Sequence, residues 1–246
     1  MGATKLDRRL KKWAQRFWPL AFWLFVWHMA SVVIGHDILL VSPLDAGKRL
    51  IELAGNGEFW GSVGLSLSRI ATGFASALAA GIVLAAASAR LPFMRHLLAP
   101  LVVTIKSVPV ASFVILILIW VSSEHLSVAI SFLMAFPIVY TTMLEGIEQT
   151  DRGLLEMADI FDIDPFNRLR FIYASQVLPY FQAACSLSLG MCWKAGIAAE
   201  VIGLPAMSIG EHLYEAKVYL ATSDLFAWTL VIICISILGD KLFSRF

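Results

Sequence analysis

Long apolar runs alternate with short polar segments along this chain. Six runs are long enough to cross a hydrocarbon layer of about 30 Å, which takes roughly 20 residues as a helix. They cover residues 18–40, 60–89, 97–120, 126–144, 179–200 and 225–243. The pattern predicts six membrane-spanning helices. The third is expected to be broken near Lys106, Ser107 and Pro109, because proline removes a hydrogen bond of the helix.

The longest polar interruption lies between residues 145 and 179. Within it, Leu154, Leu155, Ala158 and Phe161 recur on one face of a helix about two turns long. Asp164 and Pro165 then predict the start of a second helix, because aspartate caps helix N-termini and proline fits the first turn. We expect a helix, a tight turn and a helix, which suits a contact with another protein better than a catalytic pocket.

Composition assigns the class of protein. Apolar residues make up 59% and charged residues 15% of the chain, against about 45–50% and about 25% in soluble domains. The chain is expected to be an all-α, polytopic membrane protein with one membrane domain over residues 18–246. A basic amphipathic lead-in, residues 1–17, precedes that domain and is expected on the cytoplasmic side.

The distribution of lysine and arginine predicts the orientation. With six spans, thirteen of the nineteen basic residues fall on the side that holds both termini and the 145–179 loop, and three fall on the other side. Basic residues favour the cytoplasmic side, so we expect both termini and the loop in the cytoplasm. The remaining three, Arg69, Lys106 and Lys194, lie within spans.

Signatures of catalysis and metal binding are missing from the sequence. There is no GxxxxGK[ST] phosphate loop, no HExxH, no GxSxG and no His/Asp/Glu cluster with metal-ligand spacing. We therefore expect no enzyme activity, catalytic residue or metal site in this chain, and no nucleic-acid partner. The hypothesis of a membrane enzyme would rest on isolated ionisable residues alone.

The polar loop resembles the "EAA" cytoplasmic loop of ABC importer permeases. The similar residues are Glu156 to Asp162 (EMADIFD), the basic residues Arg168 and Arg170, and Val177 to Tyr180 (VLPY). Met157, Asp162 and Ser175 depart from the family, which often has Ala, Gly and Pro there. Asp162 replaces glycine at the turn, where aspartate is one of the few residues that tolerate a left-handed conformation.

A second similar stretch runs from Gly190 to Gly203 and continues at Ser208 to Gly210. It resembles the branch that imports nitrate, sulfonates, taurine, bicarbonate or vitamin precursors, and the resemblance covers about residues 60–243. It implies a type I importer permease fold, a pair of ATPase subunits that bind ATP and magnesium, an extracytoplasmic solute-binding protein and a permease homodimer in membrane lipid. The residues expected to couple to the ATPase are Glu156, Ala158, Asp159, Phe161, Asp162, Asp164 and Pro165.

Charged residues and helix breaks within the spans indicate where the translocation pathway runs, because both are costly in lipid unless they face protein or water. The candidates are Lys106, Ser107, Pro109, Trp193, Lys194 and Glu200. The basic residues Arg69, Lys106 and Lys194 favour an anionic solute. A secondary transporter or channel without an ATPase remains the alternative, in which Lys194, Glu200 and His28 would be the functional residues, but it leaves the cytoplasmic loop unexplained.

Overall fold

The computed structural model describes residues 5–36 and 38–243, and within these ranges the chain forms helices and no strands. The predicted all-α class is confirmed. The elements follow the order α1 (Lys5–Ile34), α2 (Pro43–Ala54), α3 (Gly57–Arg90), α4 (Pro92–Ser107), α5 (Val110–Ile117), α6 (Ser123–Glu148), α7 (Arg152–Ile160), α8 (Pro165–Asn167), the π-helix η1 (Arg168–Tyr173), α9 (Ala174–Gly203), α10 (Ile209–Val218) and α11 (Thr222–Phe243).

The chain forms two compact units. The first holds the residues up to 59 together with 212–231, and the second holds residues 60–211 and those from 232 onward. The predicted border between a lead-in and a membrane domain at residue 17 falls inside α1, which continues without interruption from Lys5 to Ile34. The placement of the lead-in stays a prediction.

Four helices are long and apolar enough to cross a membrane: Gly57–Arg90, Ser123–Glu148, Pro165–Gly203 and Thr222–Gly239. The predicted third span is a broken one, in which α4 and α5 meet at an angle of 106°. Val108 takes an extended conformation there and Pro109 is the N-cap of α5, so the expected break is confirmed.

The first predicted span, residues 18–40, is shorter than the sequence indicated. Its apolar helix covers Trp18–Ile34 and ends at Gly35, which adopts a left-handed φ of 65°. The helix therefore ends six residues before the predicted end of the span, because the apolar run continues beyond the glycine that ends the helix.

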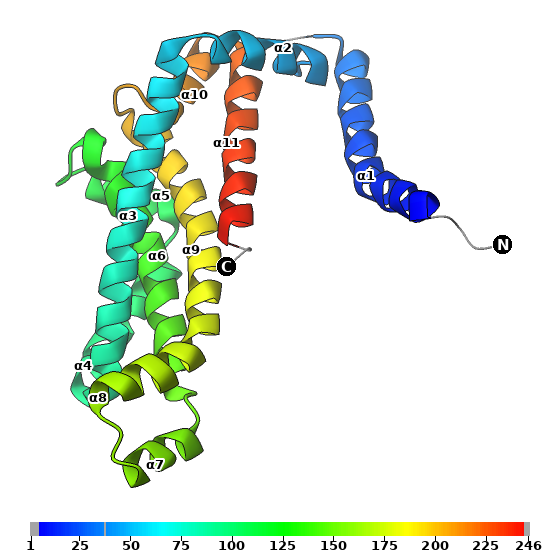
Figure 1. Ribbon diagram of the computed structural model, residues 1–246. Coiled ribbons are helices and arrows are strands. Elements are labelled where there is room, and N and C mark those ends of the chain that lie inside the picture. Colours follow the sequence, from blue (N-terminus) through cyan, green and yellow to red (C-terminus); the bar gives the residue numbers. More distant parts are fainter. Residues whose placement is uncertain (1–4, 37, 244–246) are drawn as a thin grey trace. The chain divides into compact units, whose positions relative to one another are not determined.

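In the second unit, α3, α6 and α9 run side by side (Figure 1). Small residues at four-residue spacing on α3, from Gly73 to Ala85, permit the close approach. A Cβ atom on Gly73 would lie 2.4 Å from the Val128 carbonyl oxygen of α6, and one on Gly81 would lie 2.7 Å from Val139. Ala77 and Ala85, between and beyond these glycines, are fully buried.

The helix that begins at Pro165 does not end before the fifth span. It passes through η1 into α9 and runs to Gly203, with Pro179 inside it. No residue between the predicted helix start at Pro165 and the predicted span from residue 179 ends the helix. The helix from Pro165 to Gly203 is thus continuous but bends near the start of α9, and α7 lies beyond its first residues (Figure 1).

In the first unit, α2 is capped by Ser42, whose hydroxyl oxygen accepts a hydrogen bond of 3.2 Å from the Asp45 amide. Pro43 occupies the first turn of this helix. Hydrogen bonds from Ser42 and Lys48 hold the pKa of the Asp45 carboxyl below its usual range.

Candidate functional site

The predicted turn between α7 and α8 is present and is built from local capping interactions. Asp151 caps α7, since its carboxylate accepts hydrogen bonds of 2.7 Å from the Gly153 amide and 3.3 Å from the Leu154 amide. This cap was not among the predictions, although an aspartate directly before an apolar helical pattern is a known start signal. Nine residues, Arg152–Ile160, then form the helix.

The C-terminus of α7 ends in a left-handed residue. Asp162 has φ 49°, its amide donates to the Asp159 carbonyl oxygen and the Ile163 amide donates to the Ala158 carbonyl oxygen at 2.9 Å. This pair of bonds is the Schellman arrangement, in which glycine is the usual left-handed residue. The expectation that aspartate tolerates this conformation is confirmed.

Asp164 caps the following helix as predicted. Its Oδ2 accepts a hydrogen bond of 3.1 Å from the Asn167 amide, and this bond holds the pKa of the Asp164 carboxyl below its usual range. Arg168 then donates to Asp159 at 2.6 Å. The ion pair joins α7 to η1 across the turn, so both sides of the turn are fixed relative to each other.

The predicted coupling residues lie together on this turn, and of these only Ala158 is buried. Around them the surface is apolar: the exposed fractions are 80% for Ile160, 72% for Phe161 and 68% for Phe166. Met157 is also exposed. We call Met157, Ile160, Phe161 and Phe166 the apolar tip. Of these four residues, only Phe161 belongs to the predicted coupling set.

Glu200 is fully buried in the second unit. Its Oε2 accepts hydrogen bonds from the Ser66 hydroxyl at 2.7 Å and the Gly210 amide at 3.4 Å. Ser66 accepts in turn from the Ile209 amide at 3.0 Å. Thus α3 and α9 together hold the first residues of α10 through one carboxylate.

Arg69 and Glu124 hold the loop before α10. They form an ion pair, and both contact Ala206: Arg69 donates to its carbonyl oxygen at 3.3 Å, and Glu124 accepts from its amide at 3.2 Å. Arg69, which the sequence placed among the basic residues that favour an anionic solute, is thus paired with a carboxylate of the chain itself. Leu204 and Met207, on either side of Ala206, have left-handed φ values of 50° and 52°, which are unfavourable for such side chains.

The remaining pathway candidates occupy different environments. Lys106 and Lys194 are exposed, and Lys106 donates to the Thr141 hydroxyl at 3.2 Å. Ser107 and Pro109 are exposed at the break between α4 and α5. Trp193 is buried and donates to the Ile232 carbonyl oxygen of α11 at 3.1 Å. His28, in the first unit, has no hydrogen-bond partner for Nδ1 among the described residues.

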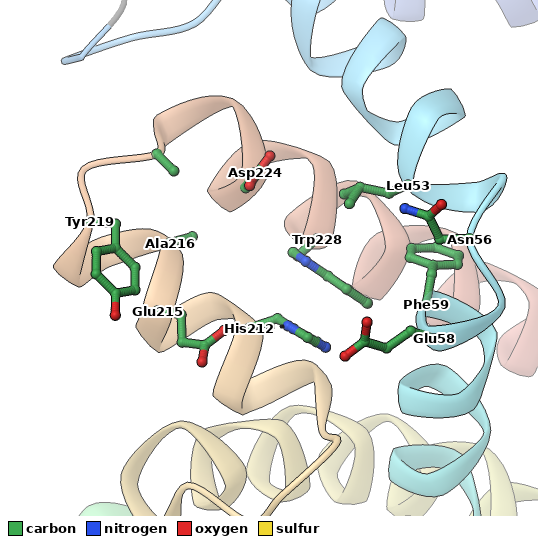
Figure 2. A pocket seen from close by; sticks show the side chains of 11 residues that line it. Leu53, Asn56, Glu58, Phe59, His212, Glu215, Ala216, Tyr219, Asp224 and Trp228 are labelled. Carbon is green, nitrogen blue, oxygen red and sulfur yellow. Dashed lines mark ion pairs between the residues drawn. The ribbon is translucent and has the colours of Figure 1, made fainter.

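The first unit contains an aromatic and acidic pocket of about 180 Å³, formed where α2 meets α3 and by α10 and α11. Figure 2 shows Trp228 between His212 and Phe59, with the Glu58 carboxylate beside them. The His212 and Trp228 rings stack with centroids 4.7 Å apart. Tyr219 and Glu215 are exposed, while Asp224 is already paired with Arg49.

A family model described as "Binding-protein-dependent transport system inner membrane component" matches residues 77–246. The match includes the 145–179 loop, Lys106, Lys194 and Glu200. It begins within α3 and leaves out α1 and α2.

Curated relatives cover more of the chain. A taurine transport system permease protein of Escherichia coli (strain K12) is 26% identical, over 95% of this chain and 90% of the relative. A bicarbonate transport system permease protein of Synechococcus elongatus is 25% identical, over 83% of this chain and 72% of the relative. A riboflavin transport system permease protein of Chloroflexus aurantiacus is 24% identical, over 100% of this chain and 97% of the relative.

Proposed function

Since the chain belongs to the family of binding-protein-dependent transport system inner membrane components, and is thus a multi-pass permease of an ABC importer in the bacterial cytoplasmic membrane, we propose that α7 couples it to an ATPase. In this proposal the termini and the 145–179 loop face the cytoplasm. A pair of partner ATPase subunits binds ATP and magnesium, and this chain supplies no catalytic residue.

The apolar tip is the observation that carries the coupling role. Large apolar side chains gathered on a polar loop outside the membrane mark a contact with another protein. Ile160 and Phe161 are among the most exposed large apolar residues of the described chain. The acidic residues Glu156, Asp159 and Asp162 surround them, which gives the contact a charged rim.

Rigidity of the turn explains how a displacement reaches the membrane. The Arg168–Asp159 ion pair and the cap at Asp164 join α7 to the helix that runs from Pro165 to Gly203. When the ATPases close on ATP, the α7 helices of the two permease copies are drawn together. The attached helices, Pro165 to Gly203 in each copy, then tilt, and the permease changes from inward-open to outward-open. Hydrolysis of ATP resets the cycle.

The coupling role is tested with Glu156→Lys and Ile160→Ser in the assembled transporter. Both variants are expected to lose uptake while the ATPase subunits still hydrolyse ATP. Leu238→Ser, at an exposed apolar position on α11 that belongs to no proposed site, is a control for the general effect of a polar substitution on the amount of assembled protein. Unchanged uptake in both α7 variants would show that the helix does not couple.

An unpaired lysine within the membrane indicates where the pathway runs. Exposed residues on α9 recur at helical spacing on one face: Leu187, Met191, Lys194, Ala198 and Ile202. Lys194 has no ion pair or hydrogen bond in the part of the chain that the structure describes. A lysine facing lipid at this depth costs several kcal/mol, so this face is assigned to the pathway between two copies of the chain.

The same reasoning favours an anionic solute. Lys106 and Lys194 have no carboxylate partner among the described residues, whereas Arg69 is neutralised by Glu124. Ser107 and Pro109 lie beside Lys106 at the α4–α5 break, where irregular backbone in a membrane faces protein or water. We assign these residues to the pathway, and we assign Trp193 and Glu200 to the support of α9.

Uptake assays with the transporter and its binding protein reconstituted together identify the transported solute. Taurine, bicarbonate and riboflavin are the first compounds to test, since relatives are named for their transport. Lys194→Gln is expected to reduce uptake of an anion at least tenfold and Lys194→Arg to retain most of it. Uptake of riboflavin alone, insensitive to Lys194→Gln, would overturn the assignment of an anionic solute.

The external partner is a solute-binding protein, and the pocket in Figure 2 belongs to the surface that would receive it. Tyr219 and Glu215 are exposed there and neighbour the loop before α11. Purification of the transporter with and without solute-loaded binding protein tests this contact. Glu215→Lys is expected to weaken the complex, and retention of full affinity would place the contact elsewhere.

A further inference from the structure

A second cavity, of about 370 Å³, lies in the larger unit beside the coupling turn. It is a partly open cavity lined by α3, α6, η1 and the start of α9. Its lining residues are Ile82, Ala86, Ala89, Arg90, Met143, Ile147, Glu148, Leu169, Tyr173, Ala174 and Val177. The volume falls within the range of about 300–1,000 Å³ that ligand pockets occupy.

The cavity is apolar along its walls and cationic at one end. Glu148 is already paired with Arg95. Arg90 is exposed and has no ion-pair or hydrogen-bond partner within the described residues. A ligand in the cavity would therefore meet the positive charge of Arg90 next to apolar side chains.

The position of Arg90 along α3 places this charge at the membrane boundary. Arg69 and Arg90 enclose twenty residues without a charge, Ile70 to Ala89. At about 1.5 Å per residue this stretch is roughly 30 Å long, which is the thickness of the hydrocarbon layer. Arg90 thus lies at the level of the lipid headgroups, and Ile82 and Ala86 lie deeper, at the level of the acyl chains.

One wall of the cavity is the π-helix that follows the coupling turn. The Ala174 amide donates to the Leu169 carbonyl oxygen, five residues back, and both residues line the cavity. π-helical turns are rare and occur frequently at functional sites. An occupant would touch the segment that joins α7 to α9.

We propose that this cavity binds an anionic phospholipid of the cytoplasmic leaflet, with the phosphate on Arg90 and an acyl chain against Ile82, Ala86 and Met143. The lipid then holds η1 against α3 and α6 and so stiffens the connection between α7 and the membrane helices. The effect on coupling and the choice of leaflet rest on the proposed function, whereas binding of the lipid does not. Lipid is favoured over a soluble anion because the cavity joins a cation at headgroup level to apolar walls at acyl-chain level.

The test uses the assembled transporter in phosphatidylcholine nanodiscs with and without phosphatidylglycerol. Native mass spectrometry measures retained phosphatidylglycerol, and ATPase activity is measured in the same samples. The wild type is expected to retain the lipid. Arg90→Gln should bind it about fivefold more weakly, which corresponds to about 1 kcal/mol for one basic residue at an anionic surface, and Arg90→Lys should retain it.

Filling the cavity tests the acyl-chain contact separately. Ala86→Phe leaves Arg90 in place but occupies the cavity, so it should also lose phosphatidylglycerol. Ala79→Phe, two turns earlier on the same helix and outside the lining, is the matched control. Unchanged lipid retention in Arg90→Gln or in Ala86→Phe would overturn the proposal.

Two further outcomes identify a different occupant. Loss of the ATPase subunits or of the second copy from Arg90→Gln, with no dependence on phosphatidylglycerol, would make the cavity a protein contact and overturn the proposal. Retention of phosphatidylglycerol is measured by mass spectrometry and does not depend on a transport assay. If Glu156→Lys leaves uptake unchanged while Arg90→Gln loses the lipid, the coupling role fails and the lipid site stands.

Discussion

The Ser66 hydroxyl donates a hydrogen bond of 2.7 Å to the buried carboxylate of Glu200, which lies 134 positions further along the chain. Through this bond α3 and α9 together hold the amides of Ile209 and Gly210. The contact explains why a carboxylate is kept inside an apolar bundle: it supplies the acceptor for the start of α10. It also gives the first prediction.

Replacing Glu200 with alanine is expected to destabilise the protein by about 1–3 kcal/mol for each buried donor that loses its acceptor. Glu200→Gln keeps one acceptor oxygen and should lose less. Thermal unfolding of the purified protein in detergent measures both variants. Equal stability of wild type and Glu200→Ala would contradict the role of this carboxylate.

Gly210 is predicted to be irreplaceable for steric reasons. A Cβ atom there would lie 2.3 Å from the Glu200 Cβ atom and 2.5 Å from the Val201 amide nitrogen. Gly210→Ala should cost at least the roughly 1–3 kcal/mol of an overpacked site. Gly190→Ala is the matched control, since nothing lies within 4 Å of its Cβ position and alanine favours a helix by about 1 kcal/mol. The yields of folded protein should diverge between the two variants, and similar yields would contradict the prediction.

The left-handed conformation of Asp162 predicts opposite effects of two substitutions. Asp162→Gly removes the penalty for φ 49° and should stabilise the turn. Asp162→Val introduces a branched side chain and should cost about 1–2 kcal/mol, with a lower ratio of uptake to ATP hydrolysis. Identical melting temperatures of the two variants would argue against a left-handed turn at this position.

Asp164 predicts a dependence of the turn on pH. The hydrogen bond from the Asn167 amide lowers the pKa of Asp164 below its ordinary value of 3.8. Its stabilising effect is therefore complete above that ordinary value and is lost as the pH falls through the lowered pKa. Exchange protection of the Asn167 amide, corrected for the intrinsic rate, measures the loss. Asp164→Asn keeps a capping oxygen without the titration, so it should show no change over the same pH range.

Local interactions could be predicted from the sequence because they depend on residues a few positions apart. The cap at Asp164, the left-handed turn at Asp162 and the break at Pro109 all follow from the properties of single residues. The neighbour of the small residues on α3, by contrast, is α6, and no local pattern specifies that pairing. The first span was overestimated because hydropathy does not show where Gly35 ends the helix.

The sequence by itself determined the class of protein, the approximate spans and the capping residues of the turn between α7 and α8, since composition and helical periodicity are properties of the chain. Only the tertiary structure decided which charges remain unpaired. Arg69 meets Glu124 across 55 positions and Glu200 meets Ser66 across 134, and no periodicity encodes such contacts. They form because a charge within a membrane must find a partner in the folded bundle. Lys194 and Arg90 have no such partner in the described chain, and we propose that they bind the solute and a phospholipid, respectively.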